Sequence, residues 1–436
     1  MENKYRLPKT VIPNHYSITI KPDLDNEKFS GSETITLKVK EKVNSIKLNS
    51  IDLVIDRAEI KDISLKSINI SEDKDHETVS VNFDEYLDPG EYKLDLDFHG
   101  DLDNSLRGFY LSRYKDDNGV DHKIGTTQFE STDARRAFPC FDEPEFKSVF
   151  SITLKVPKDL FTVSNTGIKN ILNTDSHDIY EFEDSIKMST YLVAFVIGPF
   201  EATNVVDVDG VPLRIVHAIG KSHLTDFAIE TGKFALKYFS DYFGRPYPGD
   251  KLDMIAIPDF ASGAMENLGC ITYREALLLV NKEEATQGEL TRIADVVMHE
   301  IAHMWFGDLV TMKWWNGIWL NEAFATFMAT KAVDKFNPEW ERWVEFGIEK
   351  SAAFDIDSLK STRPIEFDVI SPDDATAMFD LLTYEKGGAV LRMLEQYVGE
   401  GPFRDGIRNY LNKHEFSNTE TEDLWDSIEE FSSIPV

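Results

Sequence analysis

The stretch Met298–Gly307 reads MHEIAHMWFG and contains two histidines, His299 and His303, four residues apart. Four residues are close to one turn of a helix, so both imidazoles lie on one helix face and can reach a single metal ion. Glu300 stands between them and can face a metal-bound water without occupying a coordination position. The stretch therefore predicts a helix that carries a zinc site.

A third metal ligand is predicted at Glu322, nineteen residues after His303, in a second apolar segment that reads NEAFATFMA over residues 321–329. Two imidazoles and one carboxylate leave a fourth position for water, which is the arrangement of a catalytic zinc rather than a structural one. An amphipathic helix that carries two histidines by chance is the alternative interpretation of the first motif alone. The spacing to Glu322 argues against it.

The pattern around the motif is helical. Apolar residues recur at helical spacing from Thr291 to Phe306 without an internal Pro or Gly, and Gly307 ends the run. A helix is also predicted over residues 224–243 and a strand over residues 252–257. From Thr291 onward the chain is expected to be mainly helical.

The first two hundred residues have a different, two-residue periodicity. Apolar and polar residues alternate over residues 16–21, 35–40, 92–98 and 150–156. Alternation with one polar face predicts half-buried antiparallel strands in a sandwich or a saddle-like sheet. The character changes after residue 200. We therefore expect an α+β chain with an N-terminal β domain over residues 1–202 and a mainly helical domain over residues 203–436.

The composition of the chain argues against several classes of protein. Across 436 residues, 46 Lys+Arg face 77 Asp+Glu, a net charge of −31, which argues against binding to nucleic acid or to anionic membranes. The N-terminus lacks the apolar core of a signal peptide, and no stretch approaches the roughly 20 apolar residues of a membrane span. Cys140 and Cys270 are too few for a disulfide framework and are expected to be buried thiols. These features predict a cytoplasmic protein.

Several longer stretches resemble the aminopeptidase N-like zinc metallopeptidases, the gluzincin aminopeptidases. They are GAMEN (Gly263–Asn267), QFESTDARRAFPCFDEP (Gln128–Pro144), WFGDLVTMKWWN (Trp305–Asn316) and TYEKGGAVLRM (Thr383–Met393). The resemblance is nearest to the cytosolic archaeal and bacterial type, such as the tricorn-interacting aminopeptidases. It implies a thermolysin-like catalytic domain, one Zn2+ per chain, peptides with a free amino terminus as substrates, and a place downstream of a proteasome-like protease.

The resemblance also gives roles to residues outside the metal motif. Glu300 is expected to act as the general base, and Tyr384 to donate a hydrogen bond to the oxyanion. Glu266, with Glu130 as its partner, is expected to hold the substrate's α-ammonium group. The remaining expected substrate-binding residues are Gly263 and Ala264, which let the substrate backbone approach closely, Met265 and Gln128, which line the first side-chain pocket, and Asn267, which completes the motif.

Two other functions stay open at this point. One is a related hydrolase on the same scaffold that opens an epoxide, and the other is an inactive interaction module. GAMEN in place of a GGMEN-type segment argues against the first, and the complete set of catalytic residue types argues against the second.

Family members usually continue with a long C-terminal helical region, whereas this chain stops at Val436. We therefore expect an open zinc face over residues 250–390 and reduced activity.

Overall fold

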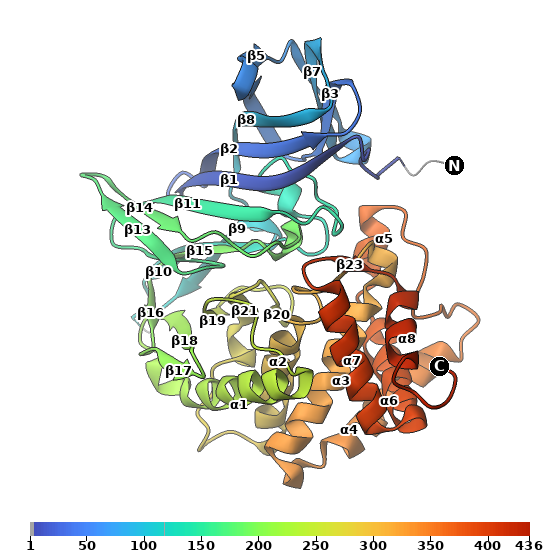
Figure 1. Cartoon of the computed structure of the whole chain (residues 1–436). Helices are drawn as coiled ribbons and strands as arrows, with labels where there is room; N and C mark the ends of the chain where they lie inside the picture. Colours follow the sequence, from blue (N-terminus) through green and yellow to red (C-terminus); the bar gives the residue numbers. More distant parts are fainter. Residues whose placement is uncertain (1–3, 117) are drawn as a thin grey trace. The chain divides into compact units, whose positions relative to one another are not determined.

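The alternating segments of the first two hundred residues form strands, as predicted, in a computed structural model that describes residues 4–116 and 118–436. The largest sheet has the order β13-β14-β11-β1-β2-β8-β4-β5 (Figure 1). Its strands are β1 (Val11–Asp23), β2 (Lys28–Val39), β4 (Leu53–Ile60), β5 (Leu65–Lys66), β8 (Gly90–Asp101), β11 (Val149–Pro157), β13 (Ile168–Asn173) and β14 (His177–Phe182).

Two smaller sheets complete this part of the chain. A four-stranded sheet has the order β12-β15-β10-β9, and a three-stranded sheet has the order β3-β7-β6. Their strands are β3 (Val43–Asn49), β6 (Asn69–Asp73), β7 (Thr78–Leu87), β9 (Gly108–Lys115), β10 (Asp121–Gln128), β12 (Phe161–Ser164) and β15 (Phe195–Gly198).

Pairing in the large sheet is antiparallel except at one place. β1 and β2 pair from Val11↔Val39 to Asp23↔Lys28, with an irregularity between Pro13 and His15. On its other side β1 pairs with β11 in parallel. The prediction of antiparallel strands is therefore wrong for this one pair, because a partner so distant along the chain can approach in either direction.

Aromatic side chains pack the four-stranded sheet on the large sheet and also pair strands within the large sheet. The ring centroids of Phe29 on β2 and Phe109 on β9 are 5.3 Å apart, and Phe109 lies 4.8 Å from Phe195 on β15. Tyr16 on β1 stacks on Phe150 of β11 at 4.9 Å. Such contacts bury large apolar surfaces, which stabilises the packing of one sheet on another.

The rest of the chain begins with a mixed sheet. β18 (Val211–Ala218) and β19 (Leu252–Ile257) are parallel, and β20 (Ala264–Met265) is antiparallel to β21 (Cys270–Arg274). The sheet order is β16-β18-β19-β21-β20, where β16 is Phe200–Ala202, and β17 (Val206–Val208) also pairs with β18. A short parallel pair of strands, β22 (Thr311–Met312) and β23 (Asn418–Thr419), lies elsewhere among the helices.

Helices dominate from residue 287 onward, in agreement with the α+β expectation. α2 packs against both α1 and α3, and α3 also packs against α4 and α6 (Figure 1). A one-turn π-helix, Leu382–Lys386, leads directly into α6 and is called the π-turn below. The helices are α1 (Asp226–Phe243), α2 (Gln287–His303), α3 (Trp319–Phe336), α4 (Arg342–Asp357), α5 (Pro372–Ala377), α6 (Gly387–Val398), α7 (Glu400–His414) and α8 (Thr421–Glu429).

The helix that carries the histidine motif has different ends from those predicted. It begins earlier, at Gln287, because Thr286 and Glu289 form a capping box that satisfies the first backbone N–H groups. It ends at His303 rather than at Phe306. The strand at residues 252–257 and the helix ending at Phe243 match the predictions.

Two compact units account for the described residues. The first contains the residues up to Glu201 together with Ile257–Ala261 and Asn267–Cys270, and the second contains Ala202–Ala256, Ser262–Glu266 and Ile271–Val436. β16 (Phe200–Ala202) lies where they divide.

Two further sequence expectations can be compared with the described residues. Cys140 and Cys270 are buried free thiols, as expected. Among the helices formed by the described residues, none combines the length and the apolar character that a membrane crossing needs.

Candidate metal centre

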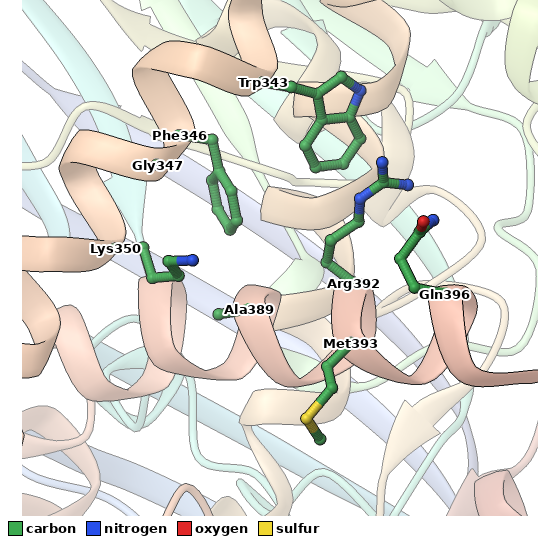
Figure 2. Close-up of a pocket in the computed structure, with 8 residues that line it drawn as sticks. All are labelled: Trp343, Phe346, Gly347, Lys350, Ala389, Arg392, Met393 and Gln396. Carbon is green, nitrogen blue, oxygen red and sulfur yellow. The ribbon is translucent and has the colours of Figure 1, made fainter.

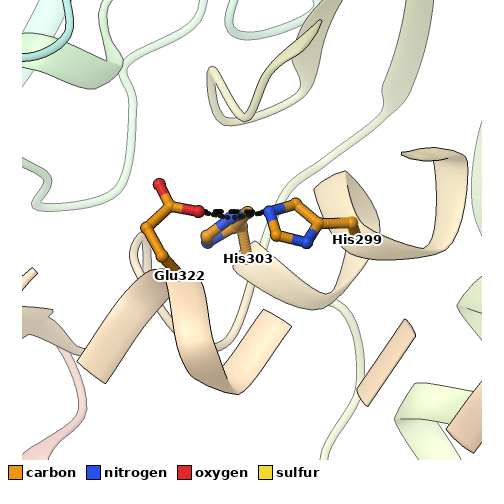
Figure 3. A group of neighbouring side chains, drawn as sticks. All are labelled: His299, His303 and Glu322. Atoms are coloured by element: carbon orange, nitrogen blue, oxygen red, sulfur yellow. Dashed lines mark hydrogen bonds and ion pairs between the residues drawn. The ribbon is translucent and has the colours of Figure 1, made fainter. Parts of the chain in front are cut away.

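Three predicted metal ligands converge in the second unit (Figure 3). His299 and His303 lie on the last turn of α2, with 3.0 Å between their Nε2 atoms. Glu322 lies on the first turn of α3, and its Oε2 atom is 3.2 Å from Nε2 of His299 and 3.4 Å from Nε2 of His303. The packing of α2 on α3 therefore brings the two segments of the motif together.

The spacing of these three atoms suits zinc. Ligand atoms that surround zinc tetrahedrally at about 2.0–2.1 Å stand about 3.3 to 3.4 Å from one another. The observed separations of 3.0, 3.2 and 3.4 Å are close to this triangle. The donor set of two imidazoles and a carboxylate also fits a catalytic zinc site.

A backbone contact orients the second histidine. Nδ1 of His303 lies 2.9 Å from the carbonyl oxygen of Phe306 and must donate, since a carbonyl can only accept. In the neutral imidazole this places the proton on Nδ1, so that Nε2 carries the lone pair that a metal binds. Gly307 makes room for the turn: its φ is +135°, and a Cβ there would stand 3.3 Å from Nδ1 of His303.

Carboxylates surround His303 and favour positive charge at this point. Burial alone would lower the pKa of the imidazole, but three neighbouring acids outweigh burial and raise the pKa well above its usual value. The acids are Glu266, Glu322 and Glu300. Burial also acts on Glu322, yet His303 and two hydrogen bonds lower its pKa to about 2. The electrostatic field here is suited to a cation.

Glu300 is the predicted general base. It follows His299 on α2 and is 6% exposed. Burial raises the pKa of its carboxyl group well above the usual value. Within the described part of the chain, its Oε2 atom makes no hydrogen bond, which leaves this oxygen available to a reacting group. A buried carboxyl group with a raised pKa is suited to general-base chemistry.

Tyr384 reaches the same centre from the π-turn. Its ring stacks on that of His299, with the centroids 5.9 Å apart and the planes 28° apart. Burial lowers the pKa of His299, which keeps this imidazole neutral and able to bind a metal. The structure thus places the Tyr384 ring beside His299, one of the predicted metal ligands, and the role of its hydroxyl at the oxyanion stays a prediction.

Most of the GAMEN segment lies in the second unit beside these residues. Ala264 and Met265 form β20 and pair with Tyr273 and Thr272 of β21. Glu266 follows directly, is 2% exposed, and has its Oε1 atom 4.0 Å from Nδ1 of His303. Burial is the main cause that raises the pKa of Glu266, to about 7. At Gly263 an added Cβ would make only an ordinary contact with Leu277, so the fold itself does not demand glycine.

Three other predicted substrate-binding residues belong to the first unit. Gln128 ends β10, and its Nε2 atom lies 3.5 Å from the carbonyl oxygen of Glu130, whose side chain is half-buried. Asn267 is buried and donates to the carbonyl oxygen of Cys270 at 3.3 Å. The structure thus gives local surroundings for Gln128, Glu130 and Asn267, and their roles in binding substrate stay predictions.

Sequence reasoning missed a group of charged residues beside the π-turn. Arg342 binds Asp295 and Glu349 there, and Glu385 lies within range of its charge. One signal was available, since Asp295 precedes His299 by four residues and so shares its helix face.

A hollow of about 330 Å³ lies between α4 and α6 (Figure 2). Arg392 from α6 lies over the Trp343 ring of α4, 4.0 Å from its centroid. The eight residues that line the hollow include no histidine, cysteine or carboxylate, so they offer no metal-ligand set: Trp343, Phe346, Gly347, Lys350, Ala389, Arg392, Met393 and Gln396.

Known proteins of one kind match this chain along most of its length. The Peptidase family M1 domain model matches residues 227–436, and the Peptidase M1 N-terminal domain model matches residues 12–192. "Aminopeptidase M1-C" of Oryza sativa subsp. japonica is 41% identical over 431 residues, which is 99% of this chain and 49% of that protein.

Two fungal aminopeptidases are also similar to this chain along its length. "Aminopeptidase 2" of Candida albicans is 42% identical over 433 residues, covering 99% of this chain and 46% of the relative. "Aminopeptidase 2, mitochondrial" of Saccharomyces cerevisiae is 40% identical over 439 residues, covering 100% of this chain and 46% of the relative. The chain spans about half the length of the curated relatives it matches. It belongs to peptidase family M1.

Proposed function

We propose that this chain acts as a zinc-dependent aminopeptidase, which removes residues from the free amino terminus of peptides. The observation that carries the proposal is the triangle of ligand atoms from His299, His303 and Glu322, with Glu300 beside it. Family membership supports the same reaction class, because the relatives named above are aminopeptidases.

We propose one zinc ion per chain, held by His299, His303 and Glu322. A zinc ion held there supplies a water ligand with a pKa near 7 and Lewis-acid polarisation of the substrate carbonyl. The negative surroundings of His303 support a divalent cation at this point.

Glu300 is the proposed general base. Its uncommitted Oε2 atom can take a proton from the attacking water, and the same carboxyl group can then give that proton to the departing amine. Burial suits both steps, because a raised pKa lets the carboxyl group hold the proton between them.

Tyr384 is the proposed donor to the oxyanion. Its ring lies against His299, so the phenol belongs to the same centre as the metal ligands. An oriented hydroxyl that donates to the developing negative charge lowers the barrier without reorganising during the reaction.

Recognition of the amino terminus is assigned to Glu266. This carboxyl group is buried near His303, where an ammonium ion would relieve the repulsion from Glu322. The resemblance makes Glu130 the second anchor. The resemblance also implies the remaining roles. Gly263 and Ala264 would lie along the substrate backbone, Met265 and Gln128 would line the first side-chain pocket, and Asn267 would complete the GAMEN segment.

The wider setting is also a proposal. We assign the N-terminal β domain to residues 1–202 and the catalytic domain to residues 203–436. A cytoplasmic enzyme that trims products of a proteasome-like protease would meet many short peptides with free amino termini. The net charge of −31 supports peptide rather than nucleic-acid substrates.

The proposal is tested by assaying an amino-acid arylamide beside its N-acetylated form, each with and without a metal chelator. Chelator-sensitive hydrolysis of the free form alone is the expected result. Hydrolysis of both forms would refute the exopeptidase assignment. No peptide hydrolysis, with turnover of an epoxide, would indicate the related hydrolase.

A further inference from the structure

A buried arginine joins α4 to the helix that carries the metal ligands. Nε of Arg342 donates to Oδ2 of Asp295 at 2.7 Å and to Oδ1 at 2.9 Å, and its Nη2 atom donates to Glu349 at 2.9 Å. The Arg342 side chain is 6% exposed, whereas Asp295 is 21% and Glu349 43% exposed. Asp295 lies on α2, so this contact fixes the start of α4 against the metal-binding helix.

The same arginine acts on the π-turn. Glu385, the residue after Tyr384, is half-buried; burial raises the pKa of its carboxyl group, and the charge of Arg342 acts against this rise. The carboxylates of Glu349 and Asp295 repel Glu385. Arg342 therefore stands among three acids from α2, α4 and the π-turn.

The geometry relates this cluster to the phenol. Asp295 and His299 are one turn apart on the same face of α2, while Glu385 and Tyr384 are neighbours on the π-turn. The ring of Tyr384 stacks on that of His299. The π-turn therefore meets α2 where the two rings stack, and it packs on α4, the helix that Arg342 binds to α2.

The charge balance makes Arg342 necessary for this contact. A single guanidinium offsets the negative charge of three carboxyl groups. Burial raises the pKa of Asp295 to about 6 and that of Glu385 to about 7. Without the guanidinium these acids would repel one another across the contact between α2 and the π-turn. α4 would then lose its anchor on α2, and the π-turn that packs on α4 would shift with it and carry Tyr384 away from His299.

We propose that Arg342 is a positioning residue, which ties α4 to α2 and so keeps the π-turn that packs on α4, with its Tyr384 phenol, over His299. This inference rests on the proposed aminopeptidase function. It adds a residue from α4 that touches neither substrate nor metal and acts only through Tyr384.

The test combines Arg342→Met with Tyr384→Phe and measures kcat, KM and zinc content. Arg342→Met is expected to lower kcat about 10- to 100-fold, as a displaced oxyanion donor would, with KM and zinc content nearly unchanged. In the Tyr384→Phe background the same substitution should change kcat no more than about twofold, because the group through which it acts is gone. Affinity for a phosphonate analogue of the tetrahedral state should fall in parallel with kcat.

Two further variants separate positioning from general destabilisation. Lys331→Met is the matched control, since Lys331 is also a buried cation with two carboxylate partners, Glu395 and Glu400 at 2.8 and 2.7 Å. It should lower the melting temperature without the selective fall in kcat. Glu385→Gln added to Arg342→Met should restore much of the lost kcat and, where the single variant folds poorly, its stability, because one repelling charge is removed.

The outcomes distinguish this inference from the proposed function. Three results would each overturn the inference while leaving an active wild-type enzyme. The first is an equal fall in kcat from Arg342→Met with and without Tyr384, and the second is a fall in kcat equal to that of Lys331→Met. The third is a loss of bound zinc from Arg342→Met. A wild-type protein that binds zinc but cleaves no peptide would instead overturn the proposed function, and the inference with it.

Discussion

A carboxylic acid in the core of the large sheet should make the first unit less stable as pH rises. Glu33 lies on β2 between Ile18 of β1 and Leu96 of β8, and is 3% exposed. Among the described residues, neither of its carboxyl oxygens has a hydrogen-bond partner. Burial raises its pKa well above 4.5. We predict that Glu33→Met stabilises the first unit at neutral pH.

The sign and the size of this effect on the unfolding free energy follow from proton linkage. Between the unfolded and the raised folded pKa, the folded state binds more protons than the unfolded state, so stability is present in full below about pH 4.5 and falls as pH rises. The fall is about 1.4 kcal/mol for each pH unit, and it stops at the folded pKa of Glu33. Methionine does not titrate. The advantage of Glu33→Met in unfolding free energy should therefore grow at that rate above pH 4.5 and then level off.

The chain offers separate probes for its two units. Cys140 and Cys270 are buried in the first unit, so thiol labelling along a urea gradient follows the unfolding of that unit. All seven tryptophans lie in the second unit, and their fluorescence serves as the internal control. Wild type and variant are compared at equal pH, which cancels the pH dependence of thiol reactivity. An advantage that is the same at pH 4.5 and pH 8 would refute the assignment of Glu33 as a buried neutral acid.

Three substitutions test the centre itself. Glu300→Gln should keep zinc while kcat falls about 10²- to 10⁴-fold, since the proton acceptor is lost, and near-normal turnover would contradict its role. Glu266→Ala should raise KM and lower kcat for unblocked peptides, because the anchor also positions the carbonyl, whereas unchanged kinetics would argue against an amine anchor. Gly307→Ala should destabilise the second unit by about 1–3 kcal/mol and weaken zinc binding, because a Cβ at φ +135° presses on His303; unchanged melting and zinc affinity would disprove that strain.

Local patterns explain which parts of the fold the sequence could predict. The alternation over residues 16–21 and 35–40 specifies which side of β1 and β2 is buried, and the strands follow it. The parallel pairing of β1 with β11 depends on segments far apart in the chain, and no short-range pattern encodes it. The early start of α2 had a visible signal in Thr286 and Glu289, since a capping box is a sequence pattern.

The same distinction applies to the metal centre. His299, Glu300 and His303 occupy one helix, so their relation follows from helix geometry alone. Arg342 joins them only because α4 folds back so that the guanidinium reaches Asp295 on α2, which is a tertiary contact. A buried ion pair between distant segments cannot be read from either segment by itself, which is why the cluster around Arg342 appears only in the folded chain.

The central claim is that one metal ion, held by His299, His303 and Glu322, supports aminopeptidase activity. The most direct measurement removes metal with a chelator and titrates zinc back while binding and arylamide hydrolysis are followed in the same sample. Hydrolytic activity should rise linearly with added zinc and stop rising at one zinc per chain. The His303→Ala variant should neither bind zinc tightly nor recover activity. Full activity in the metal-free protein, or a His303→Ala variant that recovers with the wild-type stoichiometry, would contradict the account.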